Sequence, residues 1–148
     1  MSSRSFVPSF ECTVSVEAAD IDLMGHVNNI VYLHWVQEVA TAHWRSLAGE
    51  DDQKTVLWVV SRHEIDYKHP ALLGDEVLLR TWVGSVKGLT FERHTQVQRA
   101  ADKQILAVAR TLWIPVNAST RRPQRLSAAL KAQFSVEENP ITETVSEK

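Results

Sequence analysis

Cysteine is almost absent from this sequence, in which Cys12 is the single copy among 148 residues. One cysteine excludes an internal disulfide and a structural zinc site built from several cysteines. Long apolar runs are also missing. The first ten residues lack the unbroken apolar core of a signal peptide, and no segment is long and apolar enough to cross a bilayer. We therefore expect a soluble cytoplasmic protein with no membrane partner.

Neither sign of charge is in excess. The chain has 16 Lys and Arg against 18 Asp and Glu, so no overall basic field favours nucleic acid as a partner. Its 44% hydrophobic content, with 5 Gly and 5 Pro, excludes a disordered or collagen-like chain. This length predicts one globular domain over residues 1–148 with a core of about 10–134, followed by a polar, acidic tail that we expect to be flexible.

One long amphipathic helix is predicted over residues 30–48, where polar and apolar positions recur at three- and four-residue steps. Asn28 or Asn29 would cap its start, and Gly49 stands where the helix should stop. Elsewhere the period is two, which predicts strands, and a short helix follows at 127–134. The predicted strands cover residues 10–17, 55–67, 76–86, 89–98 and 105–116.

This order of elements indicates an α+β fold in which an antiparallel sheet curls around the helix, because nothing else can cover the helix's apolar face. Such a sheet leaves exposed edges. Pairing of edges between subunits would protect them, so we expect at least a dimer.

The segment from Asp20 to Tyr32 is the best candidate for chemistry. It places two carboxylates, an imidazole and two carboxamides in one turn that ends at a helix N-terminus. Unpaired N–H groups there can hold an oxyanion, and a nearby carboxylate can attack a carbonyl or activate water. The alternative is purely structural: Asp20 and Asp22 form the turn, Asn29 caps the helix, and His26 is an ordinary loop residue.

The same segment resembles a known signature. The pattern D-x-x-G-H-V-N-N-x-x-Y is similar to that of the hotdog-fold thioesterases, above all the branch of 4-hydroxybenzoyl-CoA thioesterase and related bacterial acyl-CoA thioesterases. Two later segments, around residues 65–77 and 122–126, are also similar to this family. The residues that carry the pattern are Asp22, Gly25, His26, Val27, Asn28, Asn29 and Tyr32.

The resemblance implies a helix wrapped by about five antiparallel strands, a continuous sheet across two subunits, and a homodimer or a dimer of dimers (a homotetramer). It implies hydrolysis of acyl-CoA thioesters to free acid and coenzyme A, with no cofactor apart from the coenzyme A of the substrate. Asp22 would be the catalytic carboxylate, and Asn29 would supply the oxyanion-hole N–H. Gly25, His26, Asn28 and Tyr32 would line the site.

Several alternatives stay open at this point. Val31 replaces an Asn that many relatives carry, and branches acting on acyl carrier protein share the His-Val-Asn-Asn variant. An acyl-ACP thioesterase, a non-catalytic acyl-CoA binding module and a hotdog dehydratase are therefore rival functions. A second hotdog class uses a carboxylate from the helix, which makes Glu38 a rival catalytic residue; otherwise it is a polar surface residue.

Further side chains are candidates for binding or for packing. Basic residues could contact coenzyme A phosphates by charge-assisted hydrogen bonds; they are Lys68, Lys87, Arg93, Arg121, Arg122 and Arg125. The 6 histidines lack the short pairing of metal ligands, so no metal site is predicted. The 5 tryptophans should pack the core, and any one of them is a candidate to line an acyl pocket. Cys12 has no evident activator and is not expected to be a nucleophile.

Overall fold

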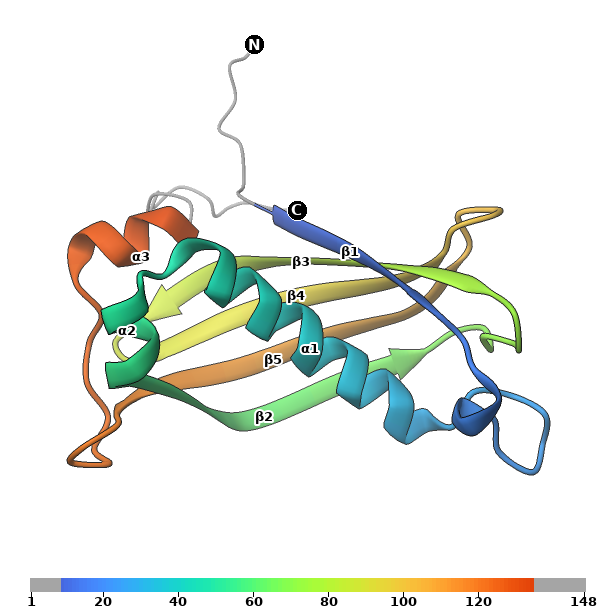
Figure 1. The fold of residues 1–148 in the computed structure, drawn as a ribbon, viewed down its shortest axis with the longest axis horizontal. Coiled ribbons are helices and arrows are strands. Elements are labelled where there is room, and N and C mark those ends of the chain that lie inside the picture. Colours follow the sequence, from blue (N-terminus) through green and yellow to red (C-terminus); the bar gives the residue numbers. More distant parts are fainter. Residues whose placement is uncertain (1–8, 135–148) are drawn as a thin grey trace, which may run out of the picture.

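The computed structural model describes residues 9–134, so the predicted flexible tail at 135–148 lies outside the described residues. One long helix, α1 (Asn29–Leu47), lies across a single sheet (Figure 1). The strands of the sheet are β1 (Ser9–Ser15), β2 (Val56–Tyr67), β3 (Glu76–Lys87), β4 (Thr90–Arg99) and β5 (Ile105–Asn117). Three shorter elements are η1 (Ala18–Asp20), α2 (Glu50–Thr55) and α3 (Ala128–Phe134).

The sheet is antiparallel throughout, with the strand order β1-β3-β4-β5-β2. Strands β1 and β2 are its edges, and α1 lies across the concave face between them (Figure 1). This arrangement confirms the α+β prediction of a sheet curled around one helix. Each predicted strand is present, with ends within two residues of those expected.

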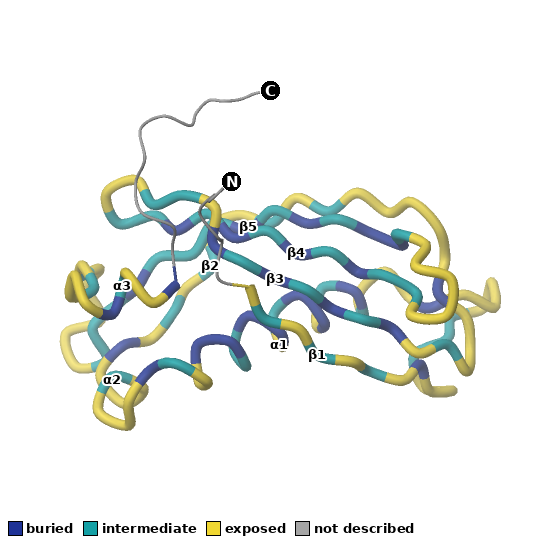
Figure 2. Tube along the Cα trace, turned by 90° about the horizontal axis from the view of Figure 1, so that it is seen from above, coloured by how far each residue is buried: buried dark blue, intermediate teal, exposed yellow. Residues whose placement is uncertain are grey.

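The core lies between α1 and the concave face of the sheet. Helix α1 buries Trp35, Val36, Val39 and Ala40, and the buried positions of β4 alternate along the strand (Figure 2). Two clusters form along the helix. One surrounds Tyr32 and Trp35 near the start of α1, and the other surrounds Trp44 near its end.

The structure differs from the prediction at the end of α1. The helix ends at Leu47 because Ala48 turns to extended backbone, and Gly49 then serves as the N-cap of α2. Helix α2 was not predicted, since its six residues have no apolar periodicity and none is buried. No helix in residues 9–134 is long and apolar enough to span a membrane.

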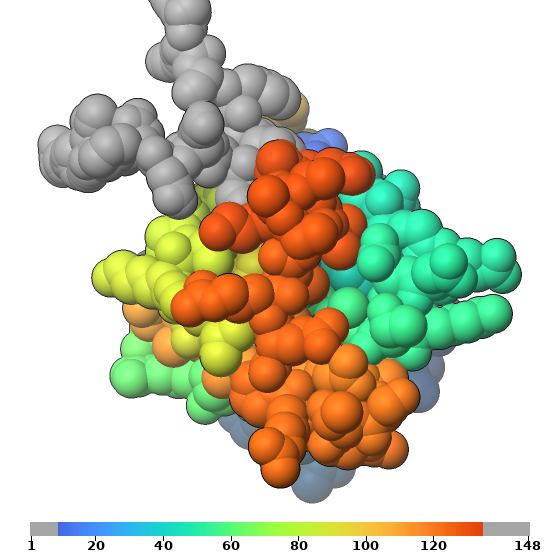
Figure 3. Space-filling view, turned by 90° about the vertical axis from the view of Figure 1, so that its left-hand side faces the viewer, coloured from blue at the N-terminus to red at the C-terminus, as the bar shows by residue number. Residues whose placement is uncertain are grey.

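The two ends of the sheet carry different features, and this decides which predicted site residues can meet. The loop between η1 and α1 lies at the end where β2 stops and β3 begins (Figure 1). The β3–β4 turn, α2 and α3 lie at the opposite end. Viewed onto that end, the orange-red α3 sits between the green α1–α2 corner and the yellow-green β3–β4 turn (Figure 3).

Candidate active site

Asp22 organises the loop that precedes α1. Its Oδ1 accepts hydrogen bonds from the N–H groups of Met24, at 2.9 Å, and His26, at 3.3 Å. The backbone closes the same turn, since the Asp22 N–H donates to the His26 carbonyl at 2.8 Å. Gly25 supplies the left-handed backbone of the turn with a φ of 82°. The turn fixes the direction in which the Asp22 carboxylate points.

The Asp22 carboxylate keeps one oxygen available. No residue in the described range 9–134 donates to its Oδ2, and the side chain is half-buried. Asp20 Oδ2 accepts the Glu17 N–H at 2.9 Å and completes a capping box on η1. Each of the two carboxylates is therefore held through one oxygen, Asp20 by η1 and Asp22 by the turn before α1, and the other oxygen of each has no donor within residues 9–134.

The N-terminus of α1 also has an open group. Asn28 is the N-cap, and its side chain accepts the Ile30 N–H at 3.0 Å. No hydrogen bond from the Asn29 N–H is found within the described part of the chain. The donors to the Asp22 carboxylate are the loop amides of Met24 and His26, not the amides of the first turn of α1.

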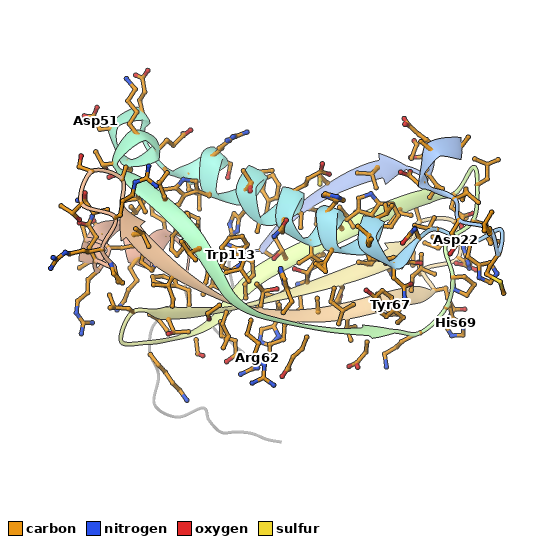
Figure 4. The ribbon with its side chains drawn as sticks, turned by 90° about the horizontal axis from the view of Figure 1, so that it is seen from below. Asp22, Asp51, Arg62, Tyr67, His69 and Trp113 are labelled. Carbon is orange, nitrogen blue, oxygen red and sulfur yellow. The ribbon has the colours of Figure 1, made fainter. Side chains whose placement is uncertain are left out.

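Two tyrosines hold the start of α1 against the end of β2 and the loop that follows it. The buried Tyr32 hydroxyl accepts the Ala71 N–H at 2.9 Å, which ties α1 to the loop after β2. Tyr67 packs edge-on against Tyr32, and its hydroxyl donates to the Asn29 carbonyl at 3.3 Å. Asp22, Tyr67 and His69 lie at the same end of the molecule (Figure 4). Sequence reasoning did not select Tyr67, which is 38 residues from its partner.

The surface around the loop is unusually apolar. Leu23 and Met24 are almost completely exposed, Ile30 and Leu73 are more than half exposed, and Leu72 is 42% exposed. Several large apolar side chains exposed at one end of a domain are typical of a binding or subunit contact.

The predicted coenzyme A contacts are divided between the two ends of the sheet. Lys68 is exposed and directly follows β2, at the end that holds Asp22. Lys87 is the last residue of β3 and lies at the opposite end of the sheet. Arg122 and Arg125 lie at that end too, and Arg125 donates to the Gly88 carbonyl. Within one chain, only Lys68 is therefore near the candidate site.

The rival residues lie elsewhere. Glu38 is an exposed residue of α1, about two and a half turns beyond Asn29, and it borders a shallow groove with Gln37 and Thr41. The pKa of the Cys12 thiol is raised by burial and, secondarily, by Glu38. Within residues 9–134, no three His, Cys, Asp or Glu side chains gather as metal ligands would.

One of the proposed phosphate contacts is not on the surface. Arg93 is only 7% exposed and donates to His43 and Thr81 inside the domain. The reason is its register: β4 alternates, and Arg93 shares the inward face with Phe91 and Thr95. Arg121, by contrast, is exposed at the end away from Asp22.

The comparisons with known proteins agree with this fold. The chain is 27% identical to a palmitoyl-acyl carrier protein thioesterase of Gossypium hirsutum over 99% of its own length, but it spans only 35% of that relative. It is 23% identical to the long-chain acyl-CoA thioesterase FadM of Escherichia coli (strain K12), covering 82% of this chain and 93% of the relative.

Solved structures share the architecture as well. A 1,4-dihydroxy-2-naphthoyl-CoA thioesterase from Synechocystis superposes with a TM-score of 0.74 at 21% identity, over 85% of this chain and 95% of that one. The model of the thioesterase-like superfamily matches residues 16–134, which include the Asp22 loop, α1 and the whole sheet from β2 onward. The chain belongs to the thioesterase-like superfamily and has its hotdog fold.

Proposed function

We propose that this protein hydrolyses acyl-CoA thioesters to a free carboxylic acid and coenzyme A. The observation that carries the proposal is that two polar groups at one end of the fold have no hydrogen-bond partner. They are the Asp22 Oδ2, which has no donor, and the Asn29 N–H, which has no acceptor, both within the described residues. The names of the two relatives above and of the Synechocystis structure support the choice of thioesters.

In the proposed reaction, the acyl carbonyl oxygen accepts the Asn29 N–H, which lies at the positive end of α1. The Asp22 carboxylate attacks the carbonyl carbon, or removes a proton from the water that attacks it. The C–S bond then breaks, and the thiolate of coenzyme A leaves and takes up a proton. Where Asp22 itself attacks, the product of this step is a mixed anhydride, and water then hydrolyses it to the free acid and the Asp22 carboxylate. A thiolate is a good leaving group, so one carboxylate and backbone donors suffice.

A homodimer fits the exposed features of the chain. The outer side of β2 has no neighbouring strand in the described sheet, and this edge exposes Leu57 and Val59. Pairing of two β2 edges would extend the sheet across both subunits. Within one chain, Lys87, Arg122 and Arg125 lie at the end away from Asp22. Pairing of the β2 edges would bring these residues of one subunit toward the Asp22 loop of the other.

Gly25, His26, Asn28 and Tyr32 would line this site, and Lys68 would meet a phosphate of coenzyme A. The acyl carrier protein relative makes an acyl-ACP substrate the second candidate. Matched CoA and ACP thioesters of the same acyl group separate the two, since the preferred carrier gives the higher kcat/KM.

The decisive variant is Asp22→Asn. Its amide oxygen can still accept the Met24 and His26 N–H groups, so the turn is preserved while the negative charge is lost. We expect kcat to fall at least about 100-fold on acyl-CoA, because a positioned base or nucleophile contributes that much. A panel of short, medium, long and aromatic acyl-CoA thioesters gives the substrate range.

Asp20→Asn is the matched control, because Asp20 lies two residues away and its carboxylate caps η1. It should keep most of the activity. Near wild-type hydrolysis by Asp22→Asn would refute the mechanism, and a replacement of Glu38 would then be the next variant. Tight binding of acyl-CoA with no product at all would instead identify a non-catalytic binding module.

A further inference from the structure

The open N–H of Asn29 is surrounded by backbone groups that already have partners. The Asn28 N–H donates to the Asp20 carbonyl at 2.9 Å, and the Asn28 carbonyl accepts the Val31 N–H at 2.9 Å. This carbonyl belongs to the same planar peptide group as the Asn29 N–H, so the bond from Val31 also fixes the direction of that N–H. The chain just before Asn29 is therefore held by residues that are near it in the sequence.

The peptide group that follows Asn29 is held from two directions. Its N–H, which is that of Ile30, donates to the Asn28 side chain at 3.0 Å. Its carbonyl, which is that of Asn29, accepts the hydroxyl of Tyr67 at 3.3 Å. Tyr67 is the last residue of β2 and lies 38 positions further along the chain. Within residues 9–134, it is the one partner from a distant part of the sequence that holds the peptide groups on either side of Asn29.

The Tyr67 side chain is itself well placed to hold this carbonyl. Its ring packs edge-on against the ring of Tyr32, with the centroids 5.3 Å apart, and Tyr32 is buried and bonded to the Ala71 N–H. Burial raises the pKa of Tyr67, so the hydroxyl keeps its proton at neutral pH and can donate. Tyr67 lies at the end of the molecule that holds Asp22 (Figure 4). The Asn29 carbonyl therefore has a donor whose ring is fixed by packing.

We infer that Tyr67 is a positioning residue for the N–H of Asn29 and acts through the Asn29 carbonyl. The inference rests on the proposed thioester hydrolysis, in which this N–H binds the acyl carbonyl oxygen. A donor that is aimed before the substrate arrives needs no reorganisation while negative charge develops on that oxygen. The bonds on both sides of Asn29 supply this aim, and the bond from Tyr67 can be removed without changing any residue of the loop or of α1.

The test removes the Tyr67 hydroxyl alone. Tyr67→Phe keeps the ring against Tyr32, and in the full-length protein we expect kcat on an acyl-CoA to fall about three- to ten-fold while KM stays the same. A displacement of about 1 Å in a catalytic group can cost about 100-fold, and the loss of one hydroxyl permits a smaller movement. A loss in kcat without a change in KM identifies an interaction that matters in the transition state. Release of the coenzyme A thiol measures both constants.

Two further measurements separate positioning from general support of the fold. An alkyl-CoA thioether has no carbonyl and cannot use the Asn29 N–H, so Tyr67→Phe should bind it as tightly as the wild type does. p-Aminophenylalanine at position 67, introduced by amber suppression, restores a donor at nearly the same place and should recover most of the lost kcat. Ser61→Ala is the matched control, because Ser61 is also on β2 and its hydroxyl donates to the Leu112 carbonyl of β5 at 3.4 Å. It should leave kcat and KM unchanged.

A wild-type kcat in Tyr67→Phe, or a raised KM with kcat unchanged, would overturn the inference. A thioether affinity that falls in step with kcat would overturn it as well, because Tyr67 would then support the binding surface as a whole. Asp22→Asn distinguishes this failure from failure of the proposed function. If Asp22→Asn is inactive while Tyr67→Phe keeps the wild-type kcat, only the positioning role is lost. If the wild type releases no thiol from any acyl-CoA, the proposed function and the positioning role are both wrong.

Discussion

Arg93 Nη1 lies 3.0 Å from Nδ1 of His43, and both side chains are buried. Arginine can only donate, so His43 Nδ1 must be the acceptor and the imidazole must be neutral. Burial, and then the charge of Arg93, lowers the pKa of His43 to about 4. This pair links a residue of α1 to the middle of β4 and makes the fold sensitive to acid.

The first prediction concerns stability against pH. The unfolded chain binds a proton at His43 near pH 6.5, while the folded chain does so only near pH 4. Stability from this group is therefore complete above about pH 6.5 and declines as the pH falls toward 4, by up to about 3 kcal/mol. Denaturant unfolding between pH 4.5 and 7.5 measures it.

His43→Asn is the matched variant, because its amide oxygen can still accept from Arg93 but does not titrate. Its unfolding free energy should vary less with pH over this window than that of the wild type. If both proteins lose stability in parallel, other groups carry the acid sensitivity.

A second prediction tests the link between α1 and the loop after β2. Tyr32→Phe leaves the buried Ala71 N–H without its acceptor, which should cost about 1–3 kcal/mol of unfolding free energy. Tyr67→Phe is the control, since its hydroxyl is at an exposed position and its bond is longer, 3.3 Å. That change should cost less than about 0.5 kcal/mol. Equal losses would show that the Ala71 contact is not the important one.

A third prediction concerns the turn that holds Asp22. Gly25 has a φ of 82°, and a Cβ added there would meet no other atom within 4 Å. Gly25→Ala should therefore destabilise through backbone strain alone, by roughly 1–2 kcal/mol. Gly25→Asn should cost less, since asparagine tolerates this conformation. Thermal unfolding of the two variants gives the ranking, and a smaller loss for alanine would contradict it.

The sequence predicted the elements whose residues repeat regularly. The 3.6-residue period gave α1 to within one residue of each end, and alternation gave the five strands. Helix α2 was not predicted because none of its six residues is buried, so its sequence shows no apolar periodicity. The Asp22 turn was also predictable, because all of its bonds join residues within four positions of each other.

Contacts between distant strands were not predictable in the same way. Alternation along β4 places Arg93 on the inward face with Phe91. This pattern could have excluded Arg93 from the predicted phosphate contacts on the sequence alone. That it meets His43, 50 residues away, depends on how α1 crosses the sheet. The bond from Tyr67 to Asn29 depends on the same crossing.

A fourth prediction tests whether Lys68 contacts a phosphate of coenzyme A. Lys68→Ala should raise the KM for an acyl-CoA about two- to five-fold, the range of an exposed ion pair, with little change in kcat. It should not change the KM for the matching S-acyl pantetheine, which lacks the nucleotide phosphates. Arg80→Ala, a partly exposed arginine in the middle of β3 beside the β1 edge, is the control. An equal effect on both substrates would remove Lys68 from phosphate binding.

The last prediction concerns the edge of the sheet. Val59 is 49% exposed on β2, whose outer edge has no neighbouring strand in the described sheet, so a lysine there costs little in the monomer but places like charges together where two β2 edges pair. Val59→Lys should therefore lower the mass seen by light scattering toward that of one chain. Thr13→Lys makes the same change on the opposite edge, β1, and should leave the assembly intact. If Thr13→Lys dissociates the protein and Val59→Lys does not, subunits join through β1, and Lys87, Arg122 and Arg125 approach the Asp22 loop by a different route or not at all.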